Sequence, residues 1–267
     1  MPVAPRHALS WFTVPGTLRV SDVTAAFWVV KGLSTAMGEA TSDFLVHTID
    51  PVVAVLLGFA AFLVALTVQF HMRRYLAWAY WSAVAMVGVF GTMAADVLHV
   101  AVGVPYPAST AFYAVVLAAV FGTWWWTERT LSMHRIDTAR RELFYWGAVV
   151  ATFAMGTALG DLTAYTFNLG YFPSAAIFAG LIVVPAVGYR WFRWNAVFSF
   201  WFAYVVTRPL GASIADGLGK PASVSGLGIG DGWVALAFGV AIVAMVAYLA
   251  ATRADVQRHP TPGLRGR

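Results

Sequence analysis

The stretch VVKGLSTAMGEATSD at residues 29–43 places one lysine and two acids within a segment that is otherwise apolar. Its central part, STAMGE (34–39), recurs as GTMAAD (91–96), GTALGD (156–161) and TRPLGA (207–212). Three copies end on an acid, and the fourth ends on Ala212. An ionised side chain near the centre of a bilayer costs about 2.5–3.5 kcal/mol, so repeated acids in such segments indicate partners, protons or a bound cation.

The composition is that of a polytopic membrane protein. Of 267 residues, 60% are hydrophobic and 11% are charged, which excludes an ordinary soluble domain. The chain has no cysteine, so a disulfide framework and thiolate metal sites are excluded, and oxygen and imidazole remain as metal ligands. Residues 1–21 lack the uninterrupted apolar core of a cleavable signal, and we interpret them as a retained tail.

Eight segments are long and apolar enough to be transmembrane helices, at roughly 20 residues per crossing. They are residues 22–47, 51–70, 76–103, 108–126, 142–169, 173–189, 194–219 and 232–252. We therefore predict an all-α integral membrane protein whose eight transmembrane helices form a single domain over residues 22–252. The recurring motif divides this domain into four parallel two-helix repeats, at about 22–70, 76–126, 142–189 and 194–252, with tails at 1–21 and 253–267.

The basic residues predict the orientation of the helices. Lys31 and Arg208 lie within spans, and Lys220 is the one basic residue outside the spans on the far side. The others lie in the tails or in connections from an even to an odd span: Arg6, Arg19, Arg73, Arg74, Arg129, Arg135, Arg140, Arg141, Arg190, Arg193, Arg253, Arg258, Arg265 and Arg267. The positive-inside rule places both termini in the cytoplasm. No nucleic-acid partner is expected, because the chain shows no basic and aromatic reading surface.

The repeat predicts how the helices are arranged. Each unit contains two crossings, so all four odd spans enter the membrane in the same direction and can converge around an axis along the membrane normal. Gly or Ala before each motif acid permits close approach of helix backbones. In the seventh span, Pro209 frees the carbonyl of Val205, which predicts either an interrupted helix at an ion site or a tolerated structural proline.

Intramembrane acids form the candidate transport site, together with a histidine that shares a helix face with one of them. These residues are Glu39, Asp43, Asp96, Asp161, Asp216 and His99. Lys31 and Arg208 are the candidate charge partners, and two cations against five acids leave a formal excess of three negative charges. The supporting polar residues are Thr35, Thr92, Thr157 and Ser213. All five acids fall in the outer half of their spans, which favours access from the exterior.

The excess of negative charge favours bound cations or shared protons. Oxygen-rich sites with an imidazole suit Mg²⁺, Mn²⁺ or Ca²⁺, and they suit Zn²⁺ less well. The candidate metal ligands are Glu39, Asp96, His99 and Asp161, and a divalent metal ion is the one cofactor considered. Equally, Glu39, Asp96 and Asp161 can bind and release protons that drive another solute.

Several motifs in order carry a family resemblance: VVKGLSTAMGE (29–39), ERTLSMH (128–134), GTALGDLT (156–163) and RPLGAS (208–213). From about residue 20 to 252, the chain resembles a bacterial family of membrane-anchored proteins built from a membrane repeat of unknown function. The resemblance implies the architecture and a place in the bacterial inner membrane. It brings no established activity, although some members are named for regulation of a secreted glycosidase.

Three functions remain open from the sequence. The first is a secondary transporter that moves a divalent metal or a proton-coupled substrate through the acidic site. The second is a membrane scaffold or regulator whose carboxylates hold helices together. The third, an intramembrane enzyme using a carboxylate and His99, lacks a recognisable nucleophile constellation, so we do not expect an enzyme. The expected partners are the lipid bilayer, a small cation or proton, and a second copy of the chain.

Overall fold

The structure, a computed structural model, describes residues 19–72 and 74–256. These residues form eight long helices and no strand, which confirms the predicted all-α class. The helices are α1 (Ala25–Thr48), α2 (Pro51–His71), α3 (Ala77–Asp96), α4 (Tyr106–Glu128), α5 (Ala139–Asp161), α6 (Tyr171–Trp191), α7 (Ala196–Gly219) and α8 (Asp231–Thr252). Most of the two predicted tails, and Arg73, lie outside the described residues.

Short elements extend or connect the long helices. The π-helices η1 (Val97–Ala101) and η3 (Leu162–Thr166) continue α3 and α5, and η2 (Met133–Arg135) and η4 (Ala222–Val224) are single 3₁₀ turns. The helix α7 continues through Pro209 without interruption, so the structure has the tolerated structural proline rather than a broken helix.

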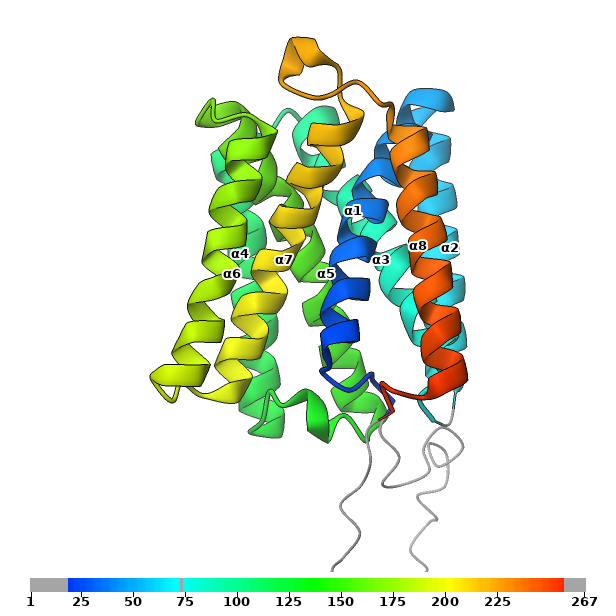
Figure 1. Cartoon of the computed structure of the whole chain (residues 1–267), viewed down its shortest axis with the longest axis vertical. Coiled ribbons are helices and arrows are strands. Elements are labelled where there is room, and N and C mark those ends of the chain that lie inside the picture. Colours follow the sequence, from blue (N-terminus) through cyan, green and yellow to red (C-terminus); the bar gives the residue numbers. More distant parts are fainter. Residues whose placement is uncertain (1–18, 73, 257–267) are drawn as a thin grey trace, which may run out of the picture.

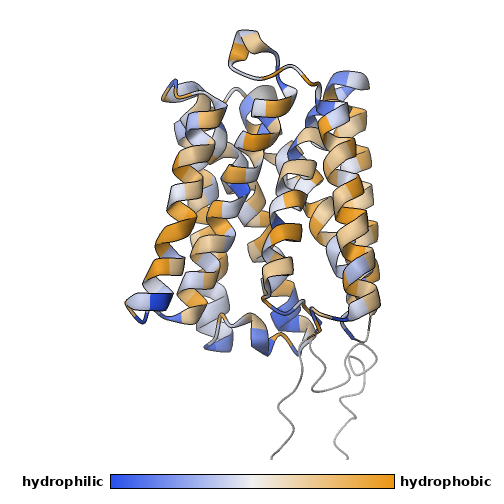
Figure 2. Cartoon of the chain, viewed as in Figure 1, coloured by the Kyte–Doolittle hydropathy of each residue, from blue (hydrophilic) through white to orange (hydrophobic). Residues whose placement is uncertain are grey.

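Seven of the eight helices are long and apolar enough to cross a membrane. The exception is α1, which carries Lys31, Glu39 and Asp43. At about 1.5 Å per residue, its 24 residues still exceed the ~30 Å thickness of a hydrocarbon core. Its polar residues are buried because α3, α7 and α8 pack around it. Figure 2 shows apolar residues along the helices and hydrophilic residues gathered mainly at their ends.

The odd-numbered helices form a closed inner ring in the order α1, α3, α5, α7, each in contact with the next and α7 in contact with α1. Each even helix packs mainly on the odd helix that follows it, and α8 packs on α1 (Figure 1). The even helices leave large apolar side chains exposed, including Val52, Leu56, Val115 and Val243. In a bilayer these side chains face the lipid, so the even helices shield a more polar inner ring.

The two ends of the bundle differ. Both ends of the described chain lie at the same end in Figure 1, where the amide of Asp22 donates to the carbonyl of Asp255 at 2.8 Å. We call this the arginine-rich end, because the even-to-odd connections with their arginines lie there too. There the buried guanidinium of Arg19 pairs with the buried carboxylate of Glu142 at 2.9 Å. The opposite end, which holds the odd-to-even connections, is the cavity end.

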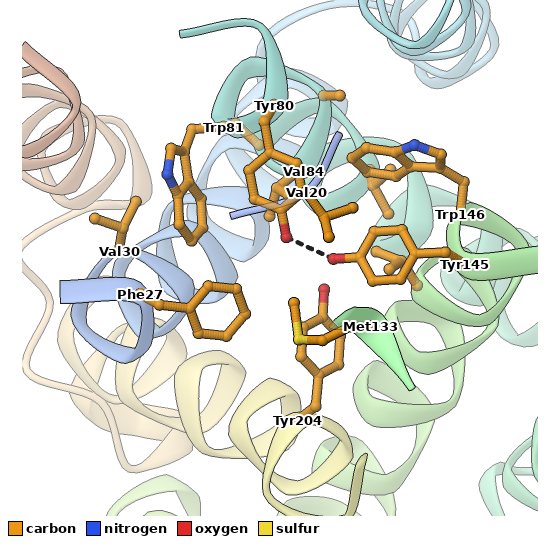
Figure 3. Packing of buried hydrophobic residues seen from close by; sticks show 14 of the residues in the cluster. Val20, Phe27, Val30, Tyr80, Trp81, Val84, Met133, Tyr145, Trp146 and Tyr204 are labelled. Atoms are coloured by element: carbon orange, nitrogen blue, oxygen red, sulfur yellow. Dashed lines mark hydrogen bonds between the residues drawn. The ribbon is translucent and has the colours of Figure 1, made fainter. Parts of the chain in front are cut away.

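Aromatic side chains fill the core in the arginine-rich half of the bundle (Figure 3). They come from all four inner helices and include Phe27, Tyr80, Tyr145 and Tyr204. The phenol oxygens of Tyr80 and Tyr145 are 2.5 Å apart, and that of Tyr204 points toward them. This packed aromatic cluster closes the inner ring on the side away from the acids.

Glycines permit close contact around the ring, as the small-residue pattern predicted. A Cβ on Gly38 would lie 2.6 Å from the backbone of Gly88, where α1 meets α3. A Cβ on Gly156 would meet Arg208 where α5 meets α7, and one on Gly211 would meet Thr35 where α7 meets α1. Because backbone atoms cannot rotate out of the way, the contact of Gly38 with Gly88 tolerates the least change.

We predict that Gly38→Ala destabilises the protein by about 1–3 kcal/mol, the usual result of inserting a methyl group into a filled core. Gly32→Ala is the matched control, because it lies on the same helix and its Cβ would meet nothing within 4 Å. It should leave stability unchanged or raise it slightly, since alanine favours helix. Thermal unfolding in detergent checks both variants, and equal unfolding temperatures would contradict the close contact.

Candidate functional site

The motif copies place equivalent residues of the four inner helices in successive layers along the ring. The motif acid position is occupied by Glu39, Asp96, Asp161 and Ala212. One turn toward the arginine-rich end, the equivalent residues are Thr35, Thr92, Thr157 and Arg208. Another turn in the same direction, they are Lys31, Gly88, Phe153 and Tyr204. Each layer therefore combines one residue from each repeat.

Arg208 holds the inner ring together. Its fully buried guanidinium pairs with the carboxylate of Glu39 at 2.5 Å. The same nitrogen, Nη2, donates to the hydroxyls of Thr92 and Thr157. The ion pair joins α7 to α1, and the threonine contacts reach α3 and α5. Since α3 stands opposite α7 in the ring, the guanidinium lies near the centre of the bundle.

The five predicted acids line one cavity of about 360 Å³ at the cavity end. Glu39 and Asp43 come from α1, Asp96 from α3, Asp161 from α5 and Asp216 from α7. The expectation that acids from separate hairpins converge agrees with this arrangement. Other lining residues lie at helix ends: His47, Pro51, Tyr106, Tyr165 and Lys220.

Three of the acids form a tighter group that fits a metal ion. One carboxylate oxygen each from Glu39, Asp43 and Asp216 lies within 4.8 Å of the others. This set differs from the predicted ligands, which combined Glu39 with Asp96, Asp161 and His99. Asp96 and Asp161 line the same cavity without joining the group. The group forms because α1 and α7 are neighbours in the ring, which brings Asp43 and Asp216 together.

Lys220 is a site residue that the sequence prediction did not include. Its ammonium group lies 2.6 Å from a carboxylate oxygen of Asp43 and 3.8 Å from one of Asp231. Burial lowers the pKa of Lys220, but the carboxylates of Asp43 and Asp216 outweigh burial and raise the pKa above its ordinary value. The ammonium form is therefore favoured beside the acids. The sequence could have pointed to Lys220, because it is the one basic residue outside the predicted spans on that side of the membrane.

Lys31 does not pair with an acid, contrary to the predicted role as a charge partner. Its fully buried Nζ lies 4.1 Å from the ring centre of Phe153 and 4.3 Å from that of Tyr204. The nitrogen has no hydrogen-bond partner among the described residues. Phe153 belongs to α5, which stands opposite α1, so Lys31 also reaches into the centre of the ring.

His99 lies outside the cavity lining. Its Nδ1 is 2.7 Å from the carbonyl oxygen of Val104, and its ring stacks on Tyr106 with centroids 3.5 Å apart. It thus supports Tyr106, which does line the cavity. Asp96 lines the cavity and His99 does not, and η1, which holds His99, begins directly after Asp96 with a longer helical period than an α-helix.

The remaining polar residues have separate positions. Thr35 donates to the carbonyl of Gly32 at 2.6 Å and packs against Gly211. Ser213 is buried, and its hydroxyl has no hydrogen-bond partner among the described residues. Thr92 and Thr157 are the two threonines that contact Arg208.

The π-helices mark the cavity in two repeats. The element η1 follows Asp96, and η3 follows Asp161. π-Helical segments are rare, and they occur frequently at functional sites. Their presence at equivalent positions of α3 and α5 supports a functional role for the acids that precede them.

A family described as Repeat of Unknown Function (DUF347) matches the chain four times, over residues 26–75, 79–130, 144–194 and 199–255. These matches cover most of the chain. The protein belongs to this family. Each match begins in an odd helix and ends just after the next even helix. No curated protein and no solved structure matches the chain.

We predict that Arg208→Met lowers stability by about 3–5 kcal/mol, because Glu39 then keeps a buried charge without its partner. Glu39→Gln should also destabilise, since it leaves Arg208 buried without a carboxylate. The double variant should recover much of the loss, because Thr92 and Thr157 still donate to backbone carbonyls of their own helices. Thermal unfolding of the four proteins measures the coupling. Additive losses would show that the ion pair does not hold the ring together.

Proposed function

We propose that all eight helices cross the bilayer as four two-helix units that enter in the same direction. The four family matches, each covering one pair of long helices, support this arrangement. We further propose that the arginine-rich end faces the cytoplasm of a bacterial cell and that the protein lies in the inner membrane. The positions of the arginines support this orientation, because basic connections remain on the cytoplasmic side.

We propose that the protein is a secondary transporter that moves a cation, either a divalent metal ion or a proton, through the acidic cavity. The observation that carries the proposal is the charge of that cavity. Five carboxylates line it, and the cations that pair with them are Arg208 and Lys220. With all groups ionised, three negative charges remain in excess. Inside a membrane such an excess calls for bound cations or protons.

The group formed by Glu39, Asp43 and Asp216 gives the substrate its coordination. Three carboxylate oxygens within 4.8 Å of one another suit a hard cation such as Mg²⁺, Mn²⁺ or Ca²⁺. Asp96 and Asp161 lie on the other side of the cavity. They can hold protons that are released or taken up when the cation binds. The ammonium of Lys220 already neutralises one charge beside Asp43, so an arriving cation competes with it.

We predict that Glu39→Gln, Asp96→Asn and Asp161→Asn each reduce cation flux into proteoliposomes. One close charge pair is worth a few kcal/mol at an effective dielectric of ~20, so roughly tenfold losses or more are expected. Asp137→Asn is the matched control, because Asp137 pairs with Arg141 at the arginine-rich end and does not line the cavity. Flux of Mn²⁺ and of protons should be recorded separately. If all three variants match the control for both ions, the cavity is not a transport site.

Lys220→Gln should strengthen the binding of a cation in the cavity. Removing the ammonium group leaves the cavity more negative, so cation affinity should rise by roughly fivefold, the ratio that ~1 kcal/mol of screened repulsion gives. Calorimetric titration of purified protein with Mn²⁺ measures this change. Unchanged or weaker binding in Lys220→Gln would contradict direct competition between the ammonium and the cation.

A second candidate function is a membrane scaffold or regulator, and the contacts of Arg208 favour it. One guanidinium joins all four inner helices, which is what a purely structural use of charge would require. The two functions make different predictions for Asp96→Asn and Asp161→Asn. In a scaffold these variants change the unfolding temperature without any dependence on added cation, whereas in a transporter the stabilisation by cation is lost.

A further inference from the structure

A lateral groove at the arginine-rich end shares no lining residue with the acidic cavity. It has a volume of about 580 Å³ and is lined from one side by α4 and its following connection and from the other by α7. Its walls include the exposed rings of Trp125 and Phe198, and Trp201 is buried at its base. The indole nitrogen of Trp201 donates to the carbonyl of Leu131 at 2.9 Å, which fixes the base of the groove to the α4–α5 connection.

The polar residues of the groove gather at one end. Arg129, Thr130 and Asn195 line it where α4 ends and α7 begins, and the rest of the lining is apolar. Arg129 is exposed, and its guanidinium has no ion-pair partner in the described part of the chain. Asn195 accepts hydrogen bonds from the amides of Val197 and Phe198, so the positive end of the α7 dipole also lies at this mouth.

The length of the groove matches one leaflet of a bilayer. Its lining on α7 runs from Asn195 to Val206, which is roughly 16 Å at 1.5 Å per residue. A hydrocarbon core is about 30 Å thick, so the groove begins at headgroup level and ends near the midplane. Its occupant therefore needs an anionic head at one end and one apolar chain of leaflet length.

We propose that this groove binds an anionic phospholipid, with an acyl chain along Trp201 and Val205 and the phosphate beside Arg129. Basic pockets between transmembrane helices hold such headgroups, and the apolar lining excludes water from the chain. The site is independent of the acidic cavity, and its ligand enters sideways from the bilayer. The lipid ties the α4–α5 connection to the start of α7, at the end where the inner ring is closed.

The test compares lipids that differ only in headgroup charge. Purified protein in detergent is titrated with dioleoyl phosphatidylglycerol or with dioleoyl phosphatidylcholine, and bound lipid is counted by native mass spectrometry alongside thermal unfolding. Phosphatidylglycerol should bind more tightly and raise the unfolding temperature. Arg129→Gln should weaken its binding by roughly fivefold, as expected for one arginine near an anionic headgroup.

Arg253→Gln is the matched control, because Arg253 also ends a helix with a positive φ, 53° as in Arg129, and does not line the groove. It should bind phosphatidylglycerol like the unaltered chain. Val205→Trp, which fills the apolar end, should lose the bound chain while Arg129 remains. The proposal is overturned if the two lipids bind equally, if Arg129→Gln and Arg253→Gln behave alike, or if glycerol phosphate alone gives the same stabilisation.

Discussion

One ion pair constrains the rest of this structure: a guanidinium with no exposure to solvent, on α7, beside a carboxylate on α1. A buried cation of this kind is costly, and its cost falls only when a counter-charge and hydrogen-bond acceptors surround it. Nη2 of Arg208 finds them on the three other inner helices, whereas Nε and Nη1 are buried without a hydrogen-bond partner among the described residues. The helices must therefore approach closely at one level, and the glycines at their contacts provide the room. The ring, its tight packing and the position of the cavity above it follow from that requirement.

Divergence among the repeats explains why the cavity is asymmetric. Four identical copies would place four acids around the ring at one level, with strong mutual repulsion. In the fourth copy, Ala212 replaces the acid, and Arg208 replaces the threonine of the other copies. One turn toward the cavity end, acids remain in the first and fourth copies, as Asp43 and Asp216. The charges are thus concentrated where α1 meets α7, and that is where the three-carboxylate group lies.

Much of this arrangement could be predicted from the sequence, because apolar length, arginine position and motif spacing are local signals. They gave eight helices, an inner set of odd helices and the five acids of the cavity. The predictions that failed concern contacts that form only when the ring of inner helices closes. A linear comparison of repeats does not show that α7 packs against α1, so Lys220 and the closeness of Asp43 to Asp216 were missed. The π-helix after Asp96 also has no simple sequence signature, and His99, which lies in it, does not line the cavity.

The predicted role of Lys31 as a charge partner was also wrong. A charge count assigns each basic residue to the nearest acids, whereas this side chain extends toward the aromatic cluster. Its side-chain nitrogen lies over the rings of Phe153 and Tyr204. The result is a second buried basic side chain near the centre of the ring, one layer beyond Arg208.

These two central basic side chains bear on the kind of transport that the cavity could support. A cation leaving the cavity toward the arginine-rich end would first meet Arg208 and then Lys31, both fully buried. In a low-dielectric interior the guanidinium of Arg208 repels it strongly, and the packed side chain of Lys31 and the aromatic cluster beyond leave no open path. An open channel for cations is therefore incompatible with this conformation. Transport through the proposed site would require the inner helices to separate, which would break the pair between Arg208 and Glu39 and free a carboxylate for the ion. Binding and opening would then be coupled through the same side chain, as a secondary transporter requires and a passive pore does not.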